Sequence, residues 1–124
     1  VAKNPLIIQV KADQLSGRAV GTGLVCEAET PVDYSTPIMV FDDSEGFVEI
    51  ISSAIRELVK DNSKLTPAPY VILVYPSGIS ANVVGHLQKL VIHAGAVHCV
   101  VLDREISADE TAEIIKHNPV PNFA

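Results

Sequence analysis

The chain has 124 residues with a hydrophobic content of 48%, which allows one aliphatic core without disulfide staples. Its formal net charge of −6 argues against a general nucleic-acid binder and against a polybasic membrane-surface protein, because both need a basic face. No run approaches the ~18 apolar residues of a membrane span. We expect a single domain over residues 1–124, preceded by a segment that this sequence, which starts at Val1, does not include.

The first part of the chain predicts two strands. Pro5–Lys11 alternates apolar and polar side chains, which is typical of a half-buried strand, and Asp13–Gly17 is typical of a turn. Arg18–Ala28 predicts a weaker strand, which Gly21 and Gly23 loosen. Its glycines and polar flanks indicate a sheet edge where a partner strand could be added, at Arg18, Val20, Thr22 and Leu24.

The next stretch predicts a loop followed by a helix. Glu27–Pro37 has little periodicity and indicates a loop, and Ile38–Phe41 is consistent with a short strand. The acidic cluster from Asp42 to Glu45 suits a helix N-terminus, where carboxylates complement the helix dipole. We expect that helix over Gly46–Lys60, with a buried stripe of Phe47, Ile51, Ala54, Ile55 and Leu58.

The clearest pattern is strand, helix and strand between Tyr70 and Leu102. Tyr70–Tyr75 is an unbroken apolar run, typical of a strand that is covered on both faces. Pro76–Ser80 is a turn in which Ser80 can cap a helix that Gly95 ends, and Ala96–Leu102 is a second apolar strand. This order favours a parallel strand pair.

A short helix completes the expected fold. Ser107 and Glu110 have the spacing of a capping box, and the helix should run to about His117, before Pro119. The fold class is therefore α/β (α+β): a mixed sheet of about four or five strands with two main helices and a short C-terminal helix. The helices can lie on one face or on both faces of a doubly wound sandwich.

Two features could carry chemistry. The turn at Ser77, Gly78 and Ser80 lies between a strand and a helix N-terminus, where free N–H groups attract anions; a capped crossover turn without a ligand is the more ordinary explanation. Cys26 and Cys99 are either two buried apolar groups or, in an oxidising compartment, a disulfide.

No pattern indicates catalysis. The four histidines lack metal-ligand spacing, and no nucleophile elbow is present, so we expect no metal, no cofactor and no catalytic residue. A strand sends His98 and Cys99 to opposite faces, which argues against a shared metal.

The second half of the chain resembles the soluble domain of the ExbD/TolR family of biopolymer-transport proteins. The residues that carry the likeness are a helix ending Ile55–Leu58, the strand Tyr70–Val74, the turn Ser77-Gly78, a helix from Leu87–Leu90 to Ala94-Gly95, and the strand Val97–Leu102. Pro5–Val10 is similar to the family's opening strand. The linker over residues 12–46 is longer than the family's, and the helix from Ser107 is additional.

The resemblance implies a non-enzymatic subunit of a proton-driven envelope complex that acts through protein–protein contacts. It implies a periplasmic domain, anchored to the inner membrane by a preceding helix, that forms a homodimer and works with an ExbB/TolQ-like channel subunit and an envelope protein or peptidoglycan. Two alternatives stay open. One is a small cytoplasmic α/β domain that binds an anionic ligand at Pro76–Ser80, and the other is a small enzyme whose site the sequence does not reveal.

Overall fold

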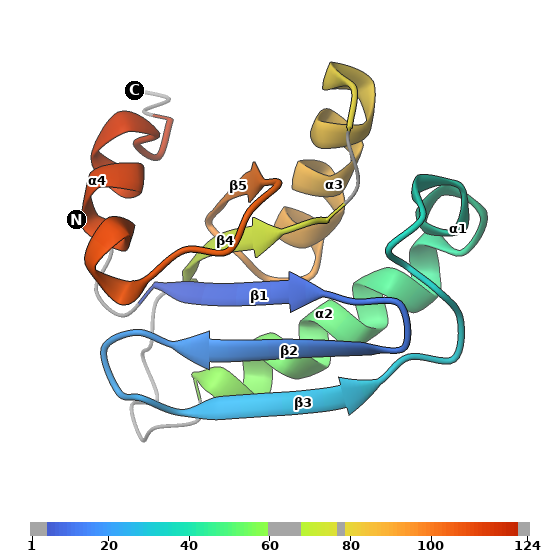
Figure 1. Cartoon of the computed structure of the whole chain (residues 1–124), viewed down its shortest axis with the longest axis horizontal. Coiled ribbons are helices and arrows are strands. Elements are labelled where there is room, and N and C mark those ends of the chain that lie inside the picture. The colour runs from blue at the N-terminus through green and yellow to red at the C-terminus, as the bar shows by residue number, and fades with distance from the viewer. Residues whose placement is uncertain (1–4, 60–67, 77–78, 122–124) are drawn as a thin grey trace.

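The computed structural model describes residues 5–59, 68–76 and 79–121 (Figure 1). Along these residues the elements are β1 (Leu6–Val10), β2 (Gln14–Ala19), β3 (Val25–Glu29), α1 (Pro37–Asp42), α2 (Ser44–Leu58), β4 (Tyr70–Val74), α3 (Ala81–His93), β5 (His98–Leu102) and α4 (Ala108–His117).

The strands form one mixed sheet in the order β3-β2-β1-β4-β5. β1 pairs with β4 in parallel, β4 pairs with β5 in parallel, and β2 runs antiparallel to both β1 and β3. A mixed five-stranded sheet with helices confirms the predicted fold class, and the parallel β4–β5 pair confirms the reading of the segment from Tyr70 to Leu102.

β4 is a continuous apolar run that lies between β1 and β5. All five of its residues are buried, so both faces of the sheet are covered at this strand. Its alternate residues contribute to two separate cores. Val71 and Leu73 belong to the core beneath α2 and α3, whereas Tyr70, Ile72 and Val74 belong to a smaller core on the opposite face.

The two main helices share one face of the sheet, and the C-terminal helix lies on the other. α2 and α3 bury their apolar stripes in the first core, and the buried stripe expected for α2 is confirmed residue by residue. On the second face, Ile106 is buried, and Ile114 and Ile115 of α4 pack against the smaller core. Figure 1 shows α2 behind β2 and β3, and α4 well away from it.

Local capping signals place the helix ends. Asp43 caps α2, and its side chain accepts a hydrogen bond from the Gly46 N–H. The Ser80 hydroxyl accepts from the Val83 N–H at the start of α3, and the Ser107 N–H donates to the Glu110 carboxylate at 3.2 Å at the start of α4. Within the described ranges no helix is long and apolar enough to cross a membrane.

One turn prediction and one strand prediction near the N-terminus are wrong. The segment Asp13–Gly17 is not a turn, because β2 begins at Gln14 and the tight turn comes earlier, where the Lys11 N–H donates to the Gln14 carbonyl at 2.9 Å. The segment Arg18–Ala28 is not one strand but the hairpin between β2 and β3. Gly23, with φ of 77°, lies in its turn.

Two further assignments downstream are corrected. The predicted loop begins too early, since β3 extends to Glu29. Ile38–Phe41 is part of the helix α1 and not a strand. Pro37 occupies the first turn of α1, where its missing N–H costs nothing and its fixed φ suits a helix.

All three tyrosines of the chain, Tyr34, Tyr70 and Tyr75, are at most 1% exposed, and each hydroxyl donates a hydrogen bond. Burial raises the pKa of Tyr34 and of Tyr70 to about 12, and it also raises the pKa of Tyr75. The folded chain therefore holds these protons more tightly than the unfolded chain does.

Alkaline titration tests this burial. Because the folded-state pKa values lie above the ordinary value near 10, the tyrosines' contribution to stability is complete below pH 10 and is lost as the pH rises to about 12. Tyrosinate absorbance and circular dichroism should change together in that window, whereas chain unfolded in urea should titrate near pH 10. Tyrosines that titrate near pH 10 while the dichroism stays intact would contradict the packing described.

Candidate functional site

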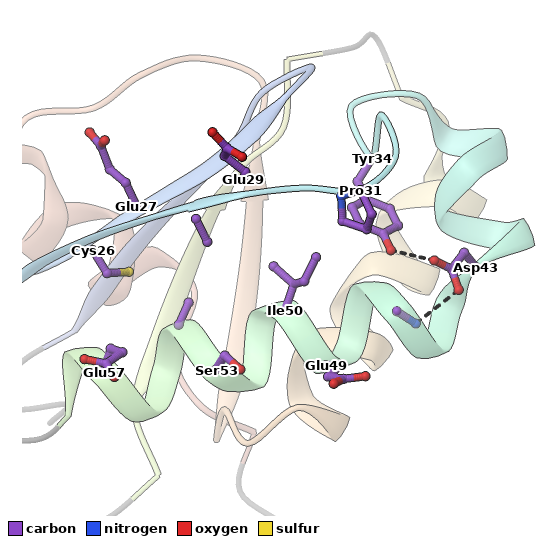
Figure 2. A pocket seen from close by; sticks show the side chains of 13 residues that line it. Cys26, Glu27, Glu29, Pro31, Tyr34, Asp43, Glu49, Ile50, Ser53 and Glu57 are labelled. Atoms are coloured by element: carbon purple, nitrogen blue, oxygen red, sulfur yellow. Dashed lines mark hydrogen bonds between the residues drawn. The ribbon is translucent and has the colours of Figure 1, made fainter.

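A groove of about 430 Å³ runs between the edge strand β3 and helix α2 (Figure 2). β3 is one of the two edges of the sheet, and all of its residues except the half-buried Cys26 are exposed. The described residues that line the groove are Cys26, Glu27, Ala28, Glu29, Pro31, Tyr34, Asp43, Gly46, Glu49, Ile50, Ser53, Ala54 and Glu57.

The groove has an apolar centre and two acidic rims. Figure 2 shows Ile50 rising from α2 toward β3, and Ala28 and Ala54 add further apolar surface. Glu27 and Glu29 extend from β3 away from the helix, and Glu49 and Glu57 line the α2 side. No described lining residue is basic, so the charged side chains of the described lining are all negative.

The outer edge of β3 carries main-chain groups that no described strand pairs. The Ala19 N–H donates to the Leu24 carbonyl at 2.8 Å, and the Thr30 N–H donates to the Asp13 carbonyl at 3.1 Å. Because hydrogen-bonded pairs alternate along an antiparallel ladder, Cys26 and Ala28 also direct their main chain toward β2. The N–H and C=O groups of Val25, Glu27 and Glu29 therefore point outward.

One end of the groove is fixed by a hydrogen-bond cluster around Asp43. The Tyr34 hydroxyl donates to Asp43 Oδ2 at 2.6 Å, and the Gly46 N–H donates to Asp43 Oδ1 at 3.3 Å (dashed in Figure 2). A Cβ at Gly46 would collide with both the Asp43 carboxylate and the Tyr34 hydroxyl. Glycine is therefore required for this close approach.

The two cysteines do not form the disulfide considered from the sequence. Cys26 and Cys99 are both free, and they lie on β3 and β5, the opposite edges of the sheet. Four strand spacings of ~4.8 Å separate these edges by roughly 19 Å, far beyond disulfide reach. Burial, reinforced by the Glu57 carboxylate, raises the pKa of the Cys26 thiol, so it stays protonated and unreactive near neutral pH.

The four residues predicted for edge interaction fall beside the edge strand and not on it. Arg18 belongs to the interior strand β2, and its guanidinium donates to the Ile106 carbonyl at 3.1 Å. Val20, Thr22 and Leu24 lie in the β2–β3 connection. Of the residues that line the edge, Glu27 falls where the predicted strand and the predicted loop overlap, and Glu29 was assigned to the loop, although their alternation with Cys26 and Ala28 is the period of a strand.

The predicted anion site at the turn before α3 has one described member. Ser77 and Gly78 lie outside the described residues. Ser80 is described, and its hydroxyl is used to cap α3 through the Val83 N–H at 3.4 Å.

The histidines are dispersed. His86 stacks on Phe41 with ring centroids 4.2 Å apart, and its Nε2 lies 3.4 Å from the Ser44 hydroxyl. His98 meets the edge of the Tyr70 ring, while Cys99 points into the first core. Within the described residues no three His, Cys, Asp or Glu side chains converge as a metal site would require.

Comparison with known proteins adds no assignment to this geometry. Neither the protein-family models nor the curated proteins contain a match to this chain.

Removal of the Asp43 side chain should destabilise the groove end. We expect Asp43→Ala to cost about 1–2 kcal/mol of the free energy of unfolding, because it removes the cap of α2 and the acceptor for Tyr34. Tyr34→Phe should cost about 1 kcal/mol. The matched control is Asp42→Ala, which removes a neighbouring exposed carboxylate and should stay within about 0.5 kcal/mol. Urea denaturation measures all three; equal costs at the two aspartates would exclude the capping role.

Proposed function

We propose that this chain is a protein-interaction domain that binds an extended, basic segment of a partner by adding it as a strand beside β3. The observation that carries this proposal is the coincidence of a strand edge that no described strand pairs with an acidic groove along the same strand. Main-chain hydrogen bonds would supply affinity, and the groove would select side chains.

The two faces of β3 define what the partner strand must present. On the face toward α2, the added strand would lie over Ala28, Ile50 and Ala54, which favours apolar side chains. On the other face it would lie beside Glu27 and Glu29, which favours lysine or arginine. An alternating apolar and basic segment satisfies both faces.

The same charges disfavour a second copy of this chain at this edge. An antiparallel self-pair that uses all of Val25–Glu29 is centred on Glu27, so Glu27 would face its own equivalent. Directly opposed like charges destabilise a strand pair, and acidic edge residues are a common protection against self-association. The homodimer expected from the family resemblance would therefore need another surface.

The envelope energy-transduction role inferred from the ExbD/TolR resemblance is one setting for such a domain and stays a prediction. It shares with the present proposal a function through protein contacts, without a catalytic residue. The alternative anionic ligand at Pro76–Ser80 has less support, because the Ser80 hydroxyl is used in the helix cap.

A proline at Glu27 tests strand addition directly. Its missing N–H would remove an outward hydrogen bond and leave the ladder to β2 intact, since prolines are tolerated on sheet edges. The probe is a fluorescent peptide of alternating lysine and valine, whose binding is followed by anisotropy. We expect Glu27→Pro to weaken binding by about tenfold or more, and Glu27→Gln by only about threefold.

Three controls define the result. A peptide of alternating glutamate and valine should not bind, and binding of the lysine peptide should weaken as salt screens the acidic rims. Glu45→Gln removes an exposed carboxylate outside the groove and should leave affinity unchanged. Equal affinity of Glu27→Pro and Glu27→Gln would show that the peptide binds by charge alone and would refute strand addition.

A further inference from the structure

A second, larger cavity lies between α4 and the sheet, on the face opposite to the groove. Its volume is about 660 Å³, within the range of small-molecule sites. Its described lining is predominantly apolar and consists of Pro5, Val20, Tyr70, Ala108, Thr111, Ala112, Ile115, Lys116, Pro119 and Val120.

The cavity is a groove beside α4 that is open to solvent, and small side chains form much of its helix side. Ala108, Thr111 and Ala112 line the cavity from the helix, and Thr111 is the one buried residue of α4. An apolar groove of this size has room for a small ligand.

The segment around the cavity is fixed at its two ends. Before α4, the Arg18 guanidinium donates to the Ile106 carbonyl at 3.1 Å, and the Gln9 amide donates to Glu105 at 3.0 Å. After α4, the Tyr70 hydroxyl donates to the Asn118 carbonyl at 2.5 Å. The helix is thereby held at both ends against the sheet, with Ile114 and Ile115 on the smaller core and the groove alongside them.

Lys116 carries the polar group of the described lining that can bind a ligand. The hydroxyls of Tyr70 and Thr111 already donate to the carbonyls of Asn118 and Ser107. Lys116 is the only charged side chain among the described lining residues. On a chain of net charge −6, a cation beside an apolar groove favours a ligand with one negative group.

We propose that this cavity binds a small aliphatic carboxylate, with its hydrocarbon chain between α4 and the sheet and its carboxylate at the Lys116 ammonium. The carboxylate would receive a charge-assisted hydrogen bond, and the apolar chain would be removed from water. This site is independent of the β3 groove, because the two cavities share no described lining residue.

The experiment titrates the full chain with decanoate, at concentrations below micelle formation, and follows binding by calorimetry and backbone amide shifts. We expect saturable binding with shifts confined to α4, Tyr70 and Val20. Octanoate should bind more weakly, by roughly fourfold for each methylene lost. Decanol should bind more weakly than decanoate in the native chain.

Matched variants separate a built site from surface adsorption. Lys116→Gln should weaken decanoate binding by about threefold and leave decanol unchanged, whereas Lys89→Gln, an exposed lysine on α3, should change neither. Ala112→Trp should fill the cavity and abolish binding, and Ala81→Trp at the exposed start of α3 is its control.

The outcomes are decisive in both directions. If Ala112→Trp fails to fold by circular dichroism, Val120→Trp, which fills the cavity from an exposed position, replaces it. Decanoate binding that persists in a folded cavity-filling variant, or that Lys116→Gln and Lys89→Gln weaken equally, would overturn the proposal. Absence of any decanoate binding to the native chain would overturn it as well.

Discussion

The architecture depends on the burial of β4 on both faces. A strand whose five residues are all buried requires a strand on each side and a covering layer above and below. α2 and α3 cover one face, and the segment that contains Ile106 and α4 covers the other. The C-terminal helix is therefore structural, because without it Tyr70, Ile72 and Val74 would contact water.

The helices cover the two faces of the sheet incompletely, and both candidate sites lie where the cover is incomplete. On the second face the buried cluster draws its strand residues from β1, β4 and β5, and the β2–β3 hairpin extends beyond it. On the first face α2 reaches as far as β3, but small residues leave a groove between them. Within the described part of the chain no strand pairs the outer side of the β2–β3 hairpin, and such a strand edge is a common point of attachment for another chain.

Elements with a long, continuous pattern were predicted correctly from the sequence, whereas short strands with a weak pattern were not. The apolar run Tyr70–Tyr75 and the stripe of α2 identified β4 and the first core, because their periodicity is long and clear. In β2 the core-facing positions are Leu15, Gly17 and Ala19, and Gly17 suggested a turn although it lies in a strand. At that position a Cβ would come within 2.9 Å of a Leu58 methyl, so the glycine lets α2 lie close to β2.

The candidate sites were harder to predict for a different reason. The groove exists because the β2–β3 hairpin occupies an edge of the sheet, and the local periodicity of a sequence does not predict the order of strands in a sheet. The acidic residues of β3 alternate correctly for a strand, but a strand of five residues between a turn and a proline carries little signal by itself. The groove beside α4 is bordered by small side chains, and alanines in a helix predict the helix without predicting a groove.

A chain of hydrogen bonds gives the groove its rigidity. The Tyr75 hydroxyl, just after β4, donates to the Tyr34 carbonyl at 2.7 Å, and the Tyr34 hydroxyl donates in turn to the Asp43 carboxylate that caps α2. Each donor is buried, so these bonds exchange poorly with water and connect the groove end to the centre of the sheet. A partner strand would therefore meet a surface that is already ordered, and less of its binding free energy would be lost in ordering the site. This argument links the buried strand β4, through two tyrosines, to the edge at which we propose that the chain functions.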